Sequence, residues 1–230
     1  MRVIEKHNMP ESKKYKLVQD IPDALLKTYL SQKEIAVDTE LQGLRLGRDQ
    51  VSLVQLCDRK GNVCLVRPNP PKAPSNLKKL LTHPKVIKIF HFALTDAAFL
   101  KASMDIDVHP YHCTKVMSKL IRTYTESHSL KELARELIGM EMIKESQSSN
   151  WDSKTLSPAQ LEYAANDVLN LLKIYDRLKA MIKDRGKLPS GITVAQLNER
   201  SQQTLPTLVD LILNGYGDRD QGWETSVFIH

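Results

Sequence analysis

The sequence predicts an α/β protein in which a mixed β-sheet is built first along the chain and helices follow. Segments with strand-like apolar patterns are concentrated in the first 90 residues, whereas helical spacing dominates from residue 114 onward. The 230 residues are 41% hydrophobic and 26% charged, which is the composition of a globular protein with a sizeable core. With no repeat and no long linker, we expect a single domain over residues 15–230, preceded by a mobile arm at residues 1–14.

The expected strands are short and are separated by turn residues. The turn Asp58-Arg59-Lys60-Gly61 favours an antiparallel hairpin between the third and fourth strands. Gly43 and Gly47 suit a second hairpin between the second and third strands. The first strand is short enough to lie at an edge of the sheet. The strand segments are 15–18, 34–38, 51–56, 62–66 and 86–90.

The expected helices are recognised by apolar spacing and by their end signals. Thr95 is a plausible N-cap for the third helix, and Gly139 is a stop signal for the fifth. Pro206 should interrupt the last helix. The helical segments are 23–31, 75–81, 96–102, 114–122, 129–138, 157–185 and 194–214.

Charge, cysteines and hydropathy limit the environment of the protein. The formal net charge of +6 suits a polyanionic partner, although many soluble proteins carry a similar charge. Three cysteines without a C-x-x-C pair indicate buried thiols in a reducing compartment. The N-terminus has no apolar signal region, and no stretch reaches 18 apolar residues. We therefore expect a soluble, cytoplasmic protein with no membrane partner.

Four carboxylates and a tyrosine occur in three short stretches that lie far apart in the chain. They are Asp38-Thr39-Glu40, then Asp96, then Tyr163-x-x-x-Asp167. Hard divalent cations prefer oxygen ligands, and two such cations about 3.5–4 Å apart can hydrolyse a phosphodiester. The pattern therefore predicts a metal-dependent phosphodiesterase site.

Each of these stretches also has an ordinary structural explanation. A D-x-E triplet occurs by chance in a chain of this length, and an acid at a helix start, such as Asp96, is favoured by the helix dipole. Tyr163 and Asp167 share one helix face among small and apolar neighbours, where the carboxylate needs either a metal or a buried arginine. The three stretches together favour the metal.

The order D-x-E, D, Y-x3-D resembles the exonuclease motifs of the DEDD superfamily in its tyrosine-containing branch. Within this branch the chain resembles the ribonuclease D group and its nano-RNase C diribonuclease family. The resemblance implies a ribonuclease H-like fold, with a five-stranded mixed sheet flanked by helices and additional C-terminal helices. The stretches that carry it are 38–44 (DTELQGL), 54–56 (VQL), 91–93 (HFA), 114–125 (TKVMSKLIRTYT), 128–133 (HSLKEL), 147–151 (QSSNW), 163–168 (YAANDV) and a tail with Gly222-Trp223, Phe228 and His230.

The resemblance also implies roles for the candidate catalytic residues. Asp38, Glu40 and Asp167 would bind one metal ion, and Asp38 would bridge to a second ion near Asp96. Tyr163 would orient or help deprotonate the attacking water by hydrogen bonding. The implied cofactors are two divalent ions, Mg²⁺ or Mn²⁺.

Substrate contacts are implied at six further positions. Leu44 would wedge against the terminal bases, although a core leucine has the same sequence signal. Gln55 and His91 are candidates for sugar or phosphate contacts. Three cations on one helix face would meet phosphate or a neighbouring subunit, or would form a solvated face. These three are Lys115, Lys119 and Arg122.

The implied activity is 3′→5′ hydrolysis of short single-stranded RNA, dinucleotides above all, to nucleoside 5′-monophosphates. The implied assembly is an octameric homo-oligomeric ring. Leu94-Thr95 departs from the family, which tends to have an arginine and an aromatic residue there. The alternatives are broader ribonuclease D-like trimming of RNA 3′ ends, DNA exonuclease activity, and an inactive nucleic-acid-binding module.

Overall fold

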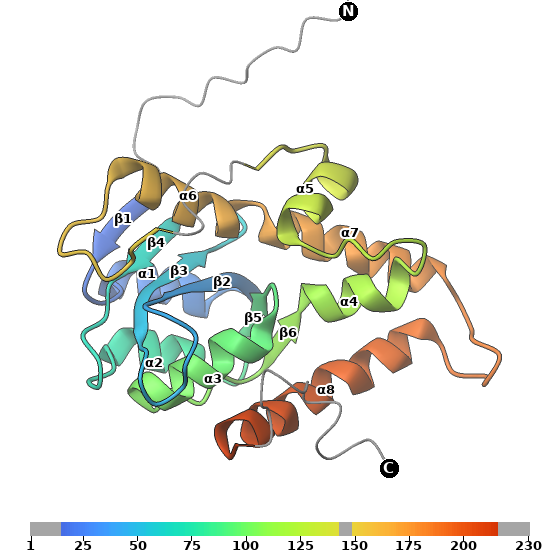
Figure 1. Cartoon of the computed structure of the whole chain (residues 1–230). Helices are drawn as coiled ribbons and strands as arrows, with labels where there is room; N and C mark the ends of the chain where they lie inside the picture. Colours follow the sequence, from blue (N-terminus) through green and yellow to red (C-terminus); the bar gives the residue numbers. More distant parts are fainter. Residues whose placement is uncertain (1–14, 143–148, 216–230) are drawn as a thin grey trace, which may run out of the picture.

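The computed structural model describes residues 15–142 and 149–215 (Figure 1). These residues form a six-stranded sheet in the order β1-β4-β3-β2-β5-β6. The β2–β3 and β3–β4 pairs are antiparallel, whereas β1–β4, β2–β5 and β5–β6 are parallel. The strands are β1 (Tyr15–Val18), β2 (Glu34–Leu41), β3 (Val51–Cys57), β4 (Val63–Val66), β5 (Ile87–Phe90) and β6 (Tyr111–Cys113).

The sheet contains one strand more than the five expected. The additional strand, β6, has three residues, which is too short for an alternating pattern to stand out in the sequence. Both hairpins expected from the turn residues are present. Gly61 adopts a φ of 80° in the β3–β4 turn, which explains the glycine at that position.

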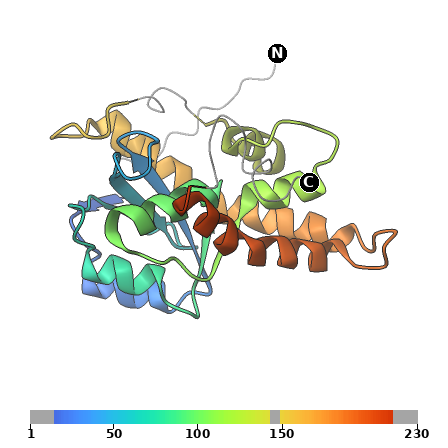
Figure 2. The ribbon, with the colours of Figure 1, turned by 60° about the horizontal axis from the view of Figure 1, so that its bottom comes forward.

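Helices cover both faces of the sheet (Figures 1 and 2). One face carries α1 (Asp23–Leu30), α2 (Ser75–Leu81) and α3 (Ala93–Met104). The other face carries α5 (Leu130–Ile138), α6 (Pro158–Leu169) and α7 (Leu171–Asp184). The remaining two helices are α4 (Thr114–Ile121) and α8 (Val194–Leu213), and α8 packs against α3, α4 and α7.

Alternation along the strands produces two hydrophobic cores. In β2, Ile35 and Val37 pack with α1–α3, whereas Ala36 packs on the side of α6 and α7. Because successive side chains of a strand point to opposite faces, this assignment fixes where the residues that follow in β2 point. The three cysteines are buried and free, as expected from their spacing.

Helix α5 ends at the stop signal that the sequence predicted, and a serine caps its start. The Ser129 hydroxyl accepts a hydrogen bond from the backbone N–H of Glu132, and Gly139 ends α5 in the left-handed conformation. The helix expected at 157–185 is instead two helices, because the chain leaves helical geometry at Asn170. Pro206 does not interrupt α8, which continues through it to Leu213.

The third helix begins earlier than expected. It starts at Ala93, and its N-cap residue is Phe92 in the left-handed conformation, so Thr95 does not cap it. The arm at 1–14, part of the 147–151 stretch and the tail at 222–230 lie outside the described residues. Among the helices of the described ranges, none is long and apolar enough to cross a bilayer.

Candidate active site

The candidate site lies where β2 ends. Alternate residues of a strand share a face, so Asp38 and Glu40 point in the direction of Ala36, toward α6. Helix α6 supplies Asp167 from its last turn. Asp38, Glu40 and Asp167 each offer an oxygen atom, and these three atoms lie within 4.8 Å of one another. The structure thus brings together three of the four acids that the sequence indicated.

The fourth acid reaches the site from the opposite face of the sheet. Thr39 points toward α3, and its hydroxyl donates a hydrogen bond of 2.6 Å to a carboxylate oxygen of Asp96. Asp96 is 6% exposed. Asp38 and Glu40 therefore lie on one face of β2. On the opposite face, Thr39 positions Asp96 through its hydroxyl group. No role was predicted for Thr39, although its place between two acids in a strand already directs its side chain away from both.

The four carboxylates form a cluster in which Asp96 and Asp167 are buried and Asp38 and Glu40 are half-buried. Burial raises the pKa of Asp96 and of Asp167 to about 7. Burial, followed by the charges of Asp167 and Asp96, raises the pKa of Glu40 to about 9. Burial and the charge of Asp96 likewise hold the pKa of Asp38 well above its ordinary value.

No cation forms an ion pair with these acids among the described residues. The arginine partner that would have explained Asp167 without a metal is thus missing from residues 15–142 and 149–215. Buried charges need either a partner or a metal. An all-oxygen donor set fits a hard divalent cation such as Mg²⁺ or Mn²⁺.

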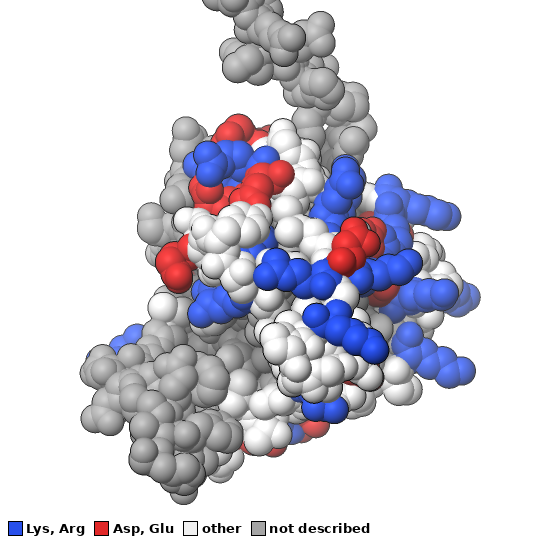
Figure 3. Space-filling model, turned by 90° about the vertical axis from the view of Figure 1, so that its right-hand side faces the viewer, with Lys and Arg blue, Asp and Glu red and all other residues white. Residues whose placement is uncertain are grey.

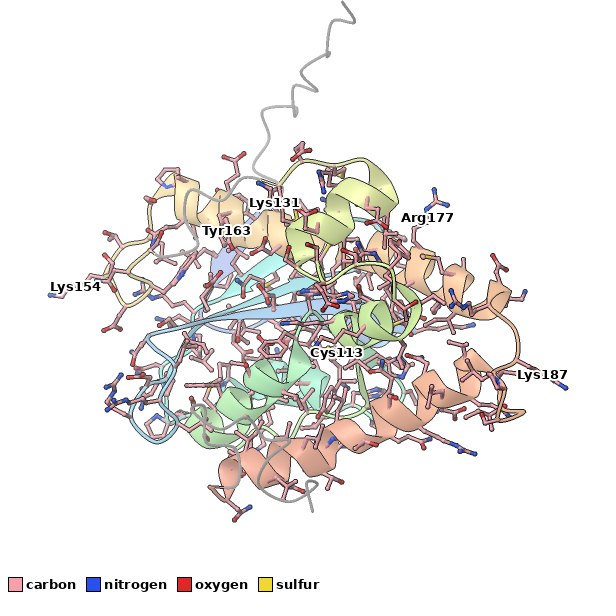
Figure 4. All side chains as sticks on the ribbon, turned by 45° about the vertical axis from the view of Figure 1, so that its right-hand side comes forward. Cys113, Lys131, Lys154, Tyr163, Arg177 and Lys187 are labelled. Atoms are coloured by element: carbon pink, nitrogen blue, oxygen red, sulfur yellow. The ribbon has the colours of Figure 1, made fainter. Side chains whose placement is uncertain are left out.

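Tyr163 lies one helical turn before Asp167, on the side of α6 that faces the strands (Figure 4). Burial, followed by the charge of Asp167, raises the pKa of the Tyr163 hydroxyl, which is therefore a neutral donor. Its hydrogen bond to Asp167 partly offsets the effect of burial on that acid. The Trp151 ring packs against the Tyr163 ring with centroids 6.2 Å apart and fixes its orientation.

Gln55 supports Glu40 and does not face solvent. It lies opposite Asp38 in the β2–β3 register, and its amide nitrogen donates to a carboxylate oxygen of Glu40 at 3.3 Å. Its side chain is fully buried. This contact orients Glu40, in place of the sugar or phosphate contact expected for Gln55.

His91 is held between β5 and α4. Its Nδ1 lies 3.0 Å from the hydroxyl oxygen of Thr114, and that hydroxyl donates to the carbonyl of Phe90. The Thr114 hydroxyl thus links the His91 ring to the end of β5. Burial and the charge of Lys115 lower the pKa of His91 to about 3, so the ring is neutral.

The three cations expected on one helix face separate into two groups. Arg122 is 1% exposed and donates to Glu136, to Ser118 and to the carbonyl of Ser127, so it anchors α4 to the following loop and to α5. Lys115 and Lys119 remain accessible on α4. Burial and the charge of Lys119 lower the pKa of Lys115. The two neighbouring positive charges of Lys115 and Lys119 favour binding of an anion.

Leu44 is 53% exposed in the β2–β3 connection, so it is not a core leucine. The backbone of this connection is tight, because a Cβ atom on Gly43 would lie 2.3 Å from a carboxylate oxygen of Asp49. That Asp49 carboxylate accepts the backbone N–H of Arg45 and closes the turn. A small residue at position 43 thus allows Leu44 to project beyond the end of β2.

Phe92 is the second exposed apolar side chain beside the acids. It is 47% exposed and has a φ of 70°, in the left-handed region. This conformation costs a residue with a side chain about 1–2 kcal/mol. The ammonium nitrogen of Lys115 lies 3.9 Å from the centroid of its ring.

The excess positive charge of the chain is distributed over its surface. Figure 3 views the side on which α7 and α8 are joined, and lysine and arginine side chains are spread over this face with acids among them. Lys187 projects outward from this connection (Figure 4). The acidic site therefore belongs to a protein whose surface attracts polyanions.

Comparison with known proteins agrees with this geometry. The sequence matches the 3′-5′ exonuclease family over residues 17–183. It is 31% identical to ribonuclease D of Haemophilus influenzae over 177 residues, which are 76% of this chain and 43% of the relative. The chain thus spans less than half the length of this relative.

Solved structures give the same assignment. Brucella melitensis NrnC superposes with a TM-score of 0.84 at 35% identity, and the match covers 95% of this chain and 100% of the NrnC chain. Escherichia coli ribonuclease D superposes with a TM-score of 0.66 at 24% identity, over 82% of this chain and 50% of that one, which shows a shared fold. The chain belongs to the 3′-5′ exonuclease family, as a ribonuclease D-like nuclease of the DEDD type.

Proposed function

We propose that this nuclease is a two-metal 3′→5′ exoribonuclease that prefers dinucleotides and other very short RNA. The observation that carries the proposal is the trio of half-buried Asp38 and Glu40 with buried Asp167, and Asp96 held beside it by Thr39. Bound divalent ions would lower the pKa of the attacking water and stabilise the leaving 3′ oxygen. Solved NrnC structures at 34% identity are described with bound Mg²⁺ and with pGG, which supports both the cofactor and the substrate.

The residues of the chain have distinct tasks in this proposal. Asp38, Glu40 and Asp167 would hold one ion, and Asp38 and Asp96 the other. Gln55 orients Glu40 through its hydrogen bond. The neutral hydroxyl of Tyr163 would orient the attacking water toward the terminal phosphodiester. Leu44 would wedge against a terminal base, since an apolar contact of this kind accepts any base.

Preference for short substrates would come from a closed end of the site. Lys115 and Lys119 would meet a terminal 5′ phosphate through charge-assisted hydrogen bonds. A longer chain would have to bury its next phosphate without a partner, which disfavours it. The resemblance of residues 114–125 to the small diribonucleases supports a homo-octameric ring whose neighbouring subunits close the site. A cytoplasmic location remains a prediction.

A length series tests the proposal with the full chain. We expect nucleoside 5′-monophosphates from 5′-labelled RNAs of two residues upward, with the dinucleotide cleaved fastest, in Mg²⁺ or Mn²⁺ and not in EDTA. A matched DNA series and light scattering accompany it, with Asp38→Asn as the inactive control. Equal rates on dinucleotide and long RNA from a monomer would favour the broader ribonuclease D-like trimmer. Preference for DNA would favour a DNA exonuclease, and absence of turnover a binding module.

A further inference from the structure

Three parallel strands end side by side along one edge of the sheet, and each carries a different chemistry there. Strands β2, β5 and β6 are neighbours in that order and run in the same direction. The end of β2 carries the acids, the residue pair after β5 includes Phe92, and α4 after β6 begins with Thr114 and Lys115. Because β5 lies between β2 and β6, residue 92 lies between the acids and Lys115 along this edge.

Neither the backbone nor the packing at position 92 favours phenylalanine. A φ of 70° is readily adopted by glycine or asparagine and strains an aromatic residue. Phe92 also remains 47% exposed, so burial offsets little of that strain. Strained conformations of this kind persist at functional sites, and an exposed aromatic ring beside an active site has a surface free for a ligand.

We propose that Phe92 is a stacking platform for a nucleobase of the substrate, a role that rests on the proposed function. In a nucleic acid, each base is attached to the sugar that links one phosphate to the next. The order acid, aromatic ring, lysine along the sheet edge matches the order scissile phosphate, base, next phosphate. The Lys115 ammonium, 3.9 Å from the ring centroid, would then meet a phosphate beside the stacked base.

Stacking also suits a nuclease that degrades RNA of any sequence. Every base has a π-face, so a ring contributes affinity without selecting a sequence. Leu44 and Phe92 are both exposed apolar side chains near the acids, one from the β2–β3 connection and one from the start of α3. Substrate bases would thus meet an aliphatic side chain on one side and an aromatic one on the other.

Steady-state kinetics of the full-length Phe92→Ala variant on pApA tests the platform. Loss of one stacked base costs about 1–3 kcal/mol, so KM should rise roughly 5–150-fold while kcat changes little. Phe92→Trp should retain most of the wild-type affinity, because the π-face is kept. The matched control is Leu17→Ala, which removes a 43% exposed apolar side chain from β1 at the opposite edge of the sheet and should leave KM unchanged.

Substrates that lack one base separate stacking from a structural role. With pApA analogues abasic at the 5′ or the 3′ residue, the Phe92→Ala penalty should disappear for one analogue, which identifies the stacked base. The Phe92→Asn variant should show the same KM defect with an unchanged or raised melting temperature, because asparagine tolerates the left-handed conformation.

Two results would overturn the platform. One is a wild-type KM in Phe92→Ala; the other is a penalty that is equal on the intact and both abasic substrates, which indicates altered structure instead of lost stacking. Failure of the proposed function is distinct from either result, because it would appear in the wild-type protein itself, as equal rates on pApA and long RNA or as no turnover of pApA.

Discussion

The two ends of strand β2 carry glutamates with opposite surroundings. At its start, Glu34 pairs with Arg59 at 2.7 Å and with Lys179 at 3.3 Å. Burial alone would raise the pKa of Glu34, but these cations outweigh it, and the pKa lies below its ordinary value. Near the other end, Glu40 has only the amide of Gln55 as a partner among the described residues, and the pKa of Glu40 is raised to about 9.

The same contrast extends to the neighbouring elements. On the side of Glu34, Arg59 also pairs with Asp176 at 2.7 Å, and the buried ammonium of Lys88 donates to three backbone carbonyls, including that of Val86 at 2.8 Å. On the side of Glu40, Asp96 and Asp167 have no cation among the described residues. The charged groups on the Glu34 side are thus paired within the chain. The four acids have no such partner among the described residues, which suits a bound metal ion.

The largest expected effect comes from neutralising the unpaired acids. Asp38→Asn, Glu40→Gln, Asp96→Asn and Asp167→Asn should each lower kcat/KM for a dinucleotide at least about 100-fold at saturating Mg²⁺. Losing an outer-shell partner already costs metal sites about 10–100-fold, and the proposal makes these residues direct ligands. Melting in EDTA should show unchanged or higher stability, because each change removes an uncompensated buried charge. Near-normal turnover in any one variant would exclude that residue from the metal site.

Tyr163→Phe should have an intermediate effect. It removes one hydrogen bond and no metal ligand, and a hydrogen bond to a charged group is worth about 1.5–3 kcal/mol, or roughly 10–150-fold in kcat. The Trp151 contact and the fold should be retained, since the ring is unchanged. Single-turnover rates at saturating metal measure the effect. Inactivation as complete as that of Asp38→Asn would indicate that the hydroxyl does more than orient water.

The contrast between the two ends also predicts opposite responses to pH. Asp96 and Asp167, with pKa values raised to about 7, hold protons more tightly in the native than in the unfolded protein. The native state is therefore favoured at low pH, and the metal-free protein loses stability as the pH rises from about 4 through 7, and toward 9 for Glu40. Mg²⁺ bound by these acids should remove this loss.

Thermal melting with and without Mg²⁺ measures this linkage. The increase in melting temperature on adding Mg²⁺ should be several degrees larger at pH 8.5 than at pH 5.5, at about 2–4 °C per kcal/mol for a chain of this size. Taking the difference at each pH cancels other titrations, such as that of Lys88. The Asp38→Asn variant is the control, and its increase should be smaller at both pH values. An increase that does not depend on pH in the wild-type protein would contradict a metal bound by these acids.

The acids were predictable from the sequence because each belongs to a recognisable local element. Asp38 and Glu40 end an apolar strand, and Tyr163 and Asp167 lie one turn apart on a strong helix. The roles of Gln55 and Arg122 were not predictable, because they depend on pairing across the fold: Gln55 meets Glu40 through the β2–β3 register, and Arg122 meets Glu136 on another helix.

The errors in the fold have local physical reasons. Strand β6 is too short to show a period, and the break at Asn170 leaves the apolar helical spacing of its flanks intact. Phe92 as an N-cap in the left-handed conformation contradicts the preferences of both caps and aromatic residues. No local rule could have placed it there, which is why a departure at this position carries functional information.

The smallest expected effect is at the paired end of β2. Glu34→Gln removes the ion pairs with Arg59 and Lys179, both of which are partly exposed, so the loss should be about 1 kcal/mol or less. The melting temperature should fall by about 2–4 °C at most at pH 7, with kcat/KM unchanged.

Because the pKa of Glu34 is depressed, its contribution to stability is present above about pH 4.5 and is lost as the pH falls through the native pKa. The difference between Glu34→Gln and wild type should therefore shrink as the pH falls below about 4.5. Glu40→Gln should behave in the opposite way, with a stability gain that grows as the pH rises in the absence of metal. If Glu34→Gln lowered turnover as Glu40→Gln does, the separation of a structural from a catalytic end of β2 would be wrong.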